Sequence, residues 1–586
     1  TPIKSSAASD VYKRQTLYLY ILIVCSMLQS CSSFLEETPY NKITAGNFFT
    51  TAKEMEQGLN GLYSRLRELY RTGYILYMCE APTDIWKSAQ AMDMEFRTWT
   101  IDATSWNVSK LWENCYVSIN QANAVIKALE NNEIPDLSDV KRAQYLGEAK
   151  FIRAHFYYHL VQQYGDVELK TEPTESLITE SYRTPAAEIW NFIIDELKFS
   201  LDNIPEEQAV YGRITREAVK HHLVRAYLTV KRSDEDVLEA KRLAEEVIVS
   251  SNHSLMDSHK DLWNIENKRN PEVLFPILFT QTIELNGAGN ELHTMFTASY
   301  SDHYPNALIR DLPYGRPWSR IRPTYYLQEL YDETKDARWE DCYRTFWRVN
   351  KEEATDMVFS PYSKKSEEIV WRKGDSVMII PKHPWTKEQV KAVWPVWVWM
   401  PDEMREELQD KIQSESNPNG EWPSNTKFQS GTMYTTLIKL QDPLRASANE
   451  MRGSRDIVVF RLGETYLLAA EACHLLGDNE KAAEYINVIR KRAAMPGKEK
   501  EMEITADQID IDFILDERAR EMAGEFCRWY DLKRTGKLYE RMNNPDMNEI
   551  VAGKFQKYHV LRPIPRDQLA RISNPEDFPQ NEGYGN

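Results

Sequence analysis

Apolar residues recur every three or four positions through most of the first 250 residues, which is the period of an amphipathic helix. The pattern predicts helices over residues 52–70, 112–129, 142–164, 186–203, 215–230 and 236–250. The stretches "REAVKHHLVRAYLTV" and "EDVLEAKRLAEEVI" follow each other closely and carry small alanines where two helices must approach. Helices paired in this way predict stacked helical hairpins of the tetratricopeptide kind.

The pattern changes between residues 251 and 457, where short apolar runs alternate with prolines, glycines and tryptophans. This region is expected to form loops and short strands over a helical scaffold. Helical periodicity returns in "FRLGETYLLAAEACHLLG" and "NEKAAEYINVIRKRAA", with a turn at Gly477 and Asp478, and the chain ends in a proline-rich wrap. The predicted fold class is mostly α, with an irregular, loop-rich second half.

Charged residues are densest in "LDERAREMAGEFCRWYDLKRTG", residues 515–536. At helical spacing an apolar stripe forms opposite Glu517, Glu521 and Arg528, so the segment is predicted to be one amphipathic helix. Glu517 and Glu521 are a like-charge pair four residues apart, and we expect Arg518, Arg520 and Arg528 to neutralise such pairs. A catalytic pair of carboxyls is the alternative, because acid/base chemistry needs two carboxyls with different pKa values. A solvated or salt-bridged helix face is the favoured interpretation.

Overall charge excludes one class of partner. The formal net charge is −17, and no long Lys/Arg stripe interrupts it, which argues against binding to nucleic acid. Aromatic residues are abundant, with 16 Trp and 31 Tyr, and nine of the tryptophans fall between Trp318 and Trp422. Flat aromatic rings in a loop-rich region are suited to a ligand with apolar C–H faces.

The N-terminal region reads as an export signal. In "KRQTLYLYILIVCSMLQSC", two basic residues precede an apolar run over 17–24, which is too short to span a bilayer, and Ser30 and Cys31 follow. Residues 28–31 resemble a bacterial lipobox, in which the cysteine carries acyl chains that anchor the protein. An ordinary cleaved signal is the alternative. Residues 1–15 lie ahead of the signal peptide, where no such extension is expected, so they are interpreted as an extraneous tail and left out of the fold prediction.

Other candidate chemistry is weak. Cys79, Cys115, Cys342, Cys473 and Cys527 are widely scattered and form no CxxC pattern, so they indicate neither a zinc site nor a redox pair, and a disulfide is permitted without being required. "HFYYH" places His155 and His159 four residues apart but lacks the general-base glutamate of a metalloprotease helix. Both histidines are predicted to be structural.

Several motifs occur together and in a fixed order: "YLGEAKFIRAHFYYHLVQQYGDV", "FRLGETYLLAAEA", "INVIRKRAA", the 515–536 segment, and "RPIP", "NP" and "QNEGY" near the end. With the lipobox and the "FLEETP" that follows it, they resemble the SusD/RagB family of surface glycan-binding lipoproteins over nearly the whole chain from Cys31. The resemblance implies an outer-membrane, cell-surface lipoprotein that has no catalytic activity and delivers oligosaccharides to a SusC-like TonB-dependent transporter. It also implies that the 515–536 charges form a network that fixes this helix against the fold.

The same resemblance suggests where ligand would bind. In the family the ligand loops follow the first helices and lie in the irregular half. Here those loops contain the candidate glycan-binding residues Trp86, Arg97, Trp99, Trp106, Tyr300, Tyr304 and Trp318. For any one aromatic residue, packing inside the fold is the alternative. No metal site and no cofactor are predicted, and a role for calcium stays open.

The predicted parts of the chain are an extraneous tail (1–15), a lipoprotein signal (16–30), a lipidated tether (31–51), a tetratricopeptide-like helical part (52–265), a loop-rich ligand-facing part (266–456) and a C-terminal part with a hairpin, the charged helix and the wrap (457–586). Two other functions stay open: an oligopeptide-binding member of the same family, and an exported hydrolase.

Overall fold

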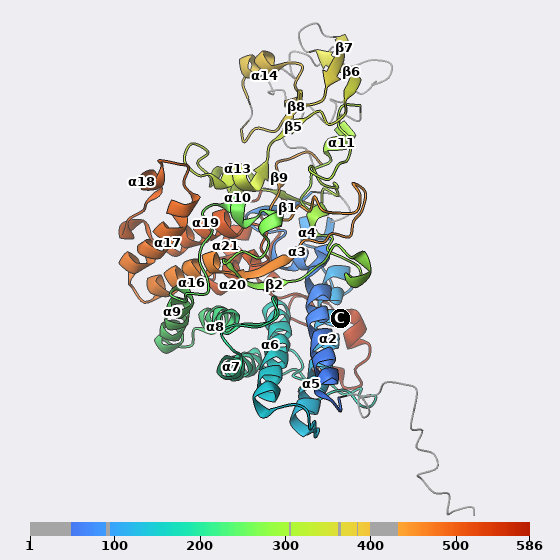
Figure 1. Ribbon diagram of the computed structural model, residues 1–586, viewed down its shortest axis with the longest axis vertical. Helices are drawn as coiled ribbons and strands as arrows, with labels where there is room; N and C mark the ends of the chain where they lie inside the picture. Colours follow the sequence, from blue (N-terminus) through green and yellow to red (C-terminus); the bar gives the residue numbers. More distant parts are fainter. Residues whose placement is uncertain are drawn as a thin grey trace, which may run out of the picture.

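The structure, a computed structural model, describes residues 49–89, 94–303, 306–360, 365–383, 385–398 and 432–585. A large helical body makes up most of it, and a smaller lobe containing β5–β8 and α14 projects from one end of that body (Figure 1). The predicted tail, signal peptide and Cys31 lie outside the described residues, as do most of the tether and Tyr304. Strands are short and pair only two by two in the described part of the chain, which confirms the mostly α fold class.

The first half of the body is built from packed helices. They are α2 (Ala52–Tyr70), α3 (Gly73–Cys79), α4 (Met94–Thr98), α5 (Trp106–Asn131), α6 (Asp139–Tyr164), α7 (Ala186–Asn203), α8 (Arg216–Val230) and α9 (Asp234–Ile248). Consecutive long helices pack against each other as hairpins, α5 on α6, α6 on α7, and α8 on α9, as the periodicity predicted. The side chain of Thr51 accepts from the main-chain N–H of Glu54, whose own side chain bonds back to Thr51, so a capping box starts α2 at its predicted residue.

The middle of the chain contributes short elements. The strands are β1 (Trp86–Ser88), β2 (Val273–Ile277), β3 (Ile321–Pro323), β4 (Tyr343–Arg344), β5 (Phe346–Arg348), β6 (Glu353–Ser360), β7 (Lys365–Arg372), β8 (Ser376–Ile379), β9 (Thr436–Leu437) and β10 (Ile457–Arg461). They form five antiparallel pairs, β1 with β3, β2 with β10, β4 with β9, β5 with β8, and β6 with β7. The short helices between them are α10 (His259–Leu262), α11 (Tyr300–His303), α12 (Tyr325–Glu329), α13 (Arg338–Cys342) and α14 (Lys387–Val393).

Helices return at the C-terminal end. They are α16 (Leu462–Leu475), α17 (Asn479–Ala493), α18 (Glu499–Met502), α19 (Ile511–Met522), α20 (Arg528–Arg534), α21 (Leu538–Met542) and α22 (Arg566–Leu569). Gly477, with φ of 80°, turns the chain between α16 and α17, which confirms the predicted hairpin. Helix α16 also packs on α9, so the two helical halves share one large core.

A second, smaller core lies in the projecting lobe. Trp347, Trp371 and Trp397 are buried there, and the main chain of Trp397 bonds to Val377 and Ile379. Trp397 belongs to the apolar stretch "WPVWVWM", and its ring packs inside the lobe. Several tryptophans of the enriched middle region are therefore core residues.

The charged segment 515–536 is two helices, and the prediction of one helix is wrong. Helix α19 ends at Met522 and α20 begins at Arg528, because Gly524 and Phe526 have φ values of 82° and 63°. These left-handed conformations cannot continue an α-helix. The break turns α20 away from α19 and lets charged residues of both helices face into the protein.

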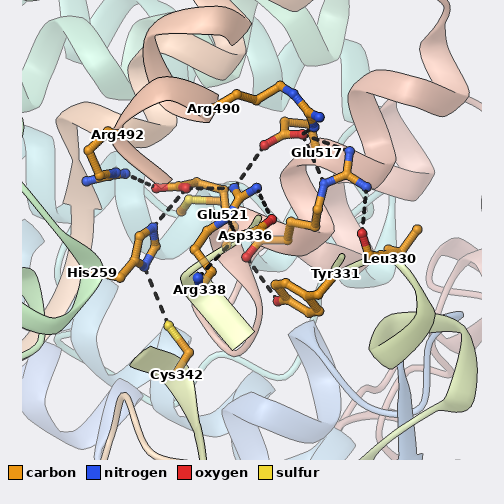
Figure 2. Close-up of polar contacts among 12 residues, drawn as sticks. His259, Leu330, Tyr331, Asp336, Arg338, Cys342, Arg490, Arg492, Glu517 and Glu521 are labelled. Atoms are coloured by element: carbon orange, nitrogen blue, oxygen red, sulfur yellow. Dashed lines mark hydrogen bonds and ion pairs between the residues drawn. The ribbon is translucent and has the colours of Figure 1, made fainter. Parts of the chain in front are cut away.

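Glu517 is buried at the centre of an arginine cluster (Figure 2). Its carboxylate accepts hydrogen bonds from Arg338 (2.8 Å), Arg490 (2.7 Å) and Arg520 (2.7 Å). Burial alone would raise the pKa of Glu517, but the guanidinium groups of Arg520, Arg338 and Arg490 lower it below its usual value. The carboxylate is thus charged and fully occupied by structural contacts.

Glu521, one turn further on, is held in the same way. Its carboxylate accepts from Arg461 (2.7 Å) and from His259 Nε2 (2.9 Å), and it also pairs with Arg338 and Arg492. Arg338, Arg461 and Arg492 come from α13, β10 and α17, and His259 comes from α10, so three ion pairs and one hydrogen bond tie α19 to four separate elements. The expectation of a charge network that fixes this helix is confirmed, and the salt-bridged face is buried rather than solvated.

Candidate functional site

Trp86 does not offer a free ring face, which corrects one predicted site residue. It is 0% exposed in β1, its indole N–H donates to Glu80 Oε2 (2.8 Å), and its ring packs on Phe296 with centroids 4.9 Å apart. Glu80 also accepts the main-chain N–H of Cys527, so Trp86 belongs to a contact that joins the two ends of the chain. Its role is structural.

Trp99 and Tyr300 are also enclosed by the fold. The Trp99 ring stacks on Trp529 (5.8 Å between centroids) and meets Phe555 edge-on (4.7 Å). The Tyr300 hydroxyl donates to the main-chain oxygen of Gly315 and accepts from the main-chain N–H of Asp311. Both side chains are buried, so neither presents a face to a ligand in this structure.

Three other predicted residues remain accessible. Trp106 is 60% exposed at the first position of α5, Arg97 is half-buried in α4, and Trp318 is half-buried in the loop before β3. Among the predicted site residues that the structure describes, Trp106 thus has the ring most open to solvent.

Helix α3 brings these accessible residues to one region. Its Tyr74 meets the Trp106 ring edge-on at 6.1 Å between centroids. Three residues later, Tyr77 packs on Phe96, the neighbour of Arg97, at 4.9 Å. The Arg320 guanidinium lies 5.9 Å from the Tyr77 ring centroid and 5.2 Å from that of Trp318. Trp106 and Arg320 therefore contact side chains of α3, Trp318 contacts Arg320, and Arg97 follows Phe96, which packs on α3. These four residues are termed the α3 patch.

Arg320 is the member of this patch that sequence reasoning missed. It stands two residues after Trp318, a spacing that would place both side chains on one face of a regular strand. Ser319 between them has φ of 53°, so the backbone is not a regular strand there. The only signal in the sequence was that Arg320 lies close to Trp318. An irregular loop has no side-chain periodicity, so the sequence could not show that the two side chains share a face.

Positive charge continues beside the patch on the β1–β3 ribbon. Lys87 of β1 lies directly opposite Arg322 of β3. The Lys87 ammonium donates to Glu549 (2.5 Å) and lies 4.7 Å from the centroid of the half-exposed Tyr325 ring. Burial lowers the pKa of Lys87 to about 8, although Glu549 acts in the opposite direction.

The α3 patch has the composition of a carbohydrate platform. Indole and phenol faces contact the apolar C–H side of a sugar, and guanidinium groups orient its hydroxyls.

In the described part of the chain no group of three or more His, Cys, Asp or Glu side chains could hold a metal ion. The histidines of "HFYYH" are buried in a hydrogen-bonded chain with Tyr70, as predicted for structural residues, and the five described cysteines are free and buried.

Comparison with known proteins identifies the family to which the chain belongs. The model described as "SusD family" matches residues 271–584, and the model described as "Starch-binding associating with outer membrane" matches residues 33–228. The chain belongs to the SusD family. SusD-like protein P25 of Formosa agariphila is 25% identical over 98% of this chain and 100% of its own length. A SusD-like protein of Bacteroides ovatus is 28% identical over 44% of this chain and 48% of its own length.

Solved structures share this SusD fold at lower identity. A laminarin-binding SusD-like protein has a TM-score of 0.64 at 20% identity, covering 91% of this chain and all of that one. Surface glycan-binding protein A from Bacteroides thetaiotaomicron, in complex with laminarihexaose, gives 0.64 at 19% identity with the same coverage. Among the described residues, no helix is both long and apolar enough to cross a bilayer.

Proposed function

We propose that this SusD family member is a surface-exposed binding protein that captures oligosaccharides and delivers them to a TonB-dependent transporter of the outer membrane. The proposal assigns it no catalytic activity. Membership of the SusD family supports the general role, and two relatives of the same fold are named for binding laminarin or for a laminarihexaose complex.

One observation carries the proposal: the open ring of Trp106 next to α3. Large aromatic side chains are usually covered, and here Trp106 is 60% exposed while Trp86 and Trp99 nearby in sequence are buried. A single exposed aromatic residue is common on protein surfaces, so the binding role rests on Trp106 together with the other accessible residues of the α3 patch. Arg320, beside Tyr77 of α3, and Trp318, beside Arg320, supply a hydrogen-bond donor and a second ring.

The N-terminal sequence supports anchoring at the membrane. Residues 28–31 resemble a lipobox and would place acyl chains on Cys31, which lies outside the described residues. One matching family model is described as associating with the outer membrane, which supports this location. A lipid anchor holds the binding protein at the surface where a transporter partner is embedded.

The surroundings of Glu517 and Glu521, which were the best candidates for catalytic carboxylates, support the proposal that the protein has no catalytic activity. Glu517 and Glu521 are buried and engaged by several arginines each, so neither is available to transfer a proton to a substrate. The proposal therefore assigns the 515–536 segment to stability.

The test is binding of the purified full chain to a mixed array of oligosaccharides and oligopeptides. We expect selective retention of one class of oligosaccharide. Trp106→Ala and Trp318→Ala should each weaken that binding at least tenfold, since removal of a stacking ring from a saccharide site loses most of its contact area. Tyr182→Ala, an exposed aromatic on the loop before α7 and not part of the α3 patch, is the matched control and should bind as the wild type does.

Three results would contradict the proposal. Retention of peptides alone would favour the oligopeptide-binding alternative. Release of reducing ends or cleaved peptides from any polymer would favour a hydrolase. Unchanged oligosaccharide affinity in both tryptophan variants would remove the α3 patch as the binding surface.

A further inference from the structure

A cavity of about 550 Å³ lies away from the α3 patch, where helices of the first half meet the C-terminal wrap. Its walls come from the C-terminal end of α6, the start of α7, the end of α8, helix α20 and the last residues of the chain. None of the α3 patch residues lines it. The volume is in the range of small-molecule sites, about 300–1,000 Å³.

The wall of the cavity is held rigidly by Arg183. Its guanidinium donates to the main-chain oxygens of Asp166 (2.9 Å) and Pro579 (2.9 Å) and to Asn581 Oδ1 (2.6 Å). The Asn581 amide in turn donates to the main-chain oxygen of Tyr164 (2.9 Å). Asn581 belongs to the "QNEGY" motif, so this motif fastens the wrap to the end of α6. A site shaped before its ligand arrives loses little entropy on binding.

The inner side of the cavity carries a lysine without an acidic partner. The Lys533 ammonium donates to the main-chain oxygen of Gln162, and no carboxylate lies within 4 Å of it in the described part of the chain. The buried side-chain nitrogen of Gln162, which also lines the cavity, has no hydrogen-bond partner among the described residues. An ammonium has three donors, so both groups retain capacity for an acceptor.

A second cation near Lys533 adds to the positive potential. Arg562 is buried, its Nη1 and Nη2 atoms have no hydrogen-bond partner, and its guanidinium lies 3.9 Å from the Trp529 ring centroid. Burial, followed by the charge of Arg562, lowers the pKa of Lys533 to about 7. Lys533 is half-buried on the lining, and Arg562 is buried outside the lining. Neither has a carboxylate partner among the described residues, which favours an anion at the position that Lys533 faces.

The other groups that face the cavity complete its chemistry. Trp190, half-buried near the start of α7, offers an indole ring. The charged side chains on the lining are Asp166, Arg183, Arg534 and Glu582, besides Lys533. Asp166 Oδ1 accepts the main-chain N–H of Ala186, Arg534 pairs with Glu471, and Glu582 is on the exposed rim. The two carboxylates are therefore engaged or peripheral, and the positive charge lies inside.

We propose that this cavity binds a monosaccharide unit that carries a carboxylate, with the carboxylate on Lys533 and the Gln162 amide and the sugar ring against Trp190. The site goes beyond the proposed function and does not depend on it, because it shares no residue with the α3 patch.

The experiment is calorimetric titration of the purified full chain with glucuronate, glucose and acetate. We expect glucuronate to bind at least tenfold more tightly than either glucose, which lacks the carboxylate, or acetate, which lacks the ring. Lys533→Met should weaken glucuronate binding at least tenfold, and Lys533→Arg should retain it. Lys537→Met, four residues further along the chain and paired with Asp512 and Glu540, is the matched control and should bind as the wild type does. Trp190→Ala should also weaken binding, and thermal melts check that each variant folds.

Each other outcome is decisive. Equal binding of glucose, or unchanged glucuronate affinity in a folded Lys533→Met, would overturn the role of the lysine. Acetate binding as tight as glucuronate would overturn the role of the sugar ring. Loss of glucuronate binding in Trp106→Ala or Trp318→Ala, with Lys533→Met unaffected, would place the acidic sugar at the α3 patch and overturn the cavity. Retention of oligosaccharides by Lys533→Met tests the proposed function separately.

Discussion

The buried histidines of the helical core make the stability of this protein sensitive to mild acid. His159 is enclosed between Tyr70 and Tyr530, with its Nε2 3.1 Å from one hydroxyl and its Nδ1 2.8 Å from the other. His155 bonds to the same Tyr70 hydroxyl at 2.8 Å. Burial, with a smaller contribution from Arg225, lowers the pKa of His159 to about 3. The ring therefore stays uncharged in the folded protein at every pH at which the fold survives.

The sign of the effect follows from linkage. An unfolded histidine has a pKa of about 6.5, so below that pH the unfolded chain binds a proton that folded His159 does not. Stability is then lost as the pH falls. For one such histidine the free energy of unfolding decreases by about 2 kcal/mol between pH 7 and pH 5. His155 and His222 are buried with pKa values well below 6.5 for the same reason, so the three together remove about 6 kcal/mol over this interval.

Replacement of one histidine isolates its contribution to the pH dependence of the free energy of unfolding. His159→Gln loses hydrogen bonds to the two tyrosines and should cost about 1–3 kcal/mol at pH 7. It also removes one proton-binding group from the unfolded chain, so the deficit relative to wild type should shrink by about 2 kcal/mol at pH 5. Urea unfolding followed by circular dichroism at both pH values measures the difference. His253→Gln, at a surface turn where the ring bonds to the Pro271 carbonyl, is the matched control.

Parallel pH profiles for wild type and His159→Gln would refute the reasoning. They would mean that the folded protein accepts a proton at this position, through a change of the Tyr70–His159–Tyr530 chain that the structure does not contain. A profile that steepens in the variant would refute the sign.

Three further substitutions test the assignments of single residues. Trp86→Ala should reduce the free energy of unfolding by about 3–5 kcal/mol, because it empties a core position and removes the indole donor to Glu80 Oε2. Chemical denaturation measures this, and a fully stable variant would contradict the structural role. Glu521→Gln should cost about 3–5 kcal/mol in the same assay, since several buried cations lose their counter-charge, whereas the exposed Glu540→Gln should cost under about 0.5 kcal/mol. Trp106→Ala should change stability by less than about 0.5 kcal/mol, and a large loss would show that its ring packs rather than binds.

The helical frame was predictable because its signal is local. Helix α7 occupies its predicted range, and α2 begins at the residue set by a capping box that is visible in the sequence. Helix α6 ends at its predicted residue, but α5 and α6 begin six and three residues before their predicted starts at 112 and 142. The single helix expected over 515–536 was wrong, since the period does not reveal that Gly524 and Phe526 adopt left-handed conformations.

Residues of the candidate site were less predictable, because the burial of an aromatic ring depends on distant partners. Trp86 and Trp106 read alike in the sequence, in one polar, tryptophan-containing stretch. Trp86 is covered because β1 pairs with β3 and its ring packs on Phe296, both contributed by the irregular half of the chain. Trp106 starts a long helix with its ring outside the core and stays open. No local pattern distinguishes the two.

The charged helices show the same limit in a different form. The expectation that arginines offset the like-charged Glu517 and Glu521 was correct, but of the three local candidates, Arg520 alone pairs with either of these two carboxylates, through Glu517. Arg518 pairs with Glu464 and Asp531, and Arg528 pairs with Asp84. The main counter-charges for Glu517 and Glu521 come from Arg338, Arg461, Arg490 and Arg492.

This exchange of partners has a structural consequence. Since Glu517 and Glu521 contact side chains from α10, α13, β10 and α17, the position of α19 depends on all four elements. Loss of any one cation leaves a buried charge uncompensated, which is far more costly than loss of an exposed pair. The segment therefore acts as a junction that holds the base of the irregular half in one arrangement. A loop region with little regular structure of its own can then present Trp318 and Arg320 beside α3 in a defined position, although nothing in its own periodicity would fix them there.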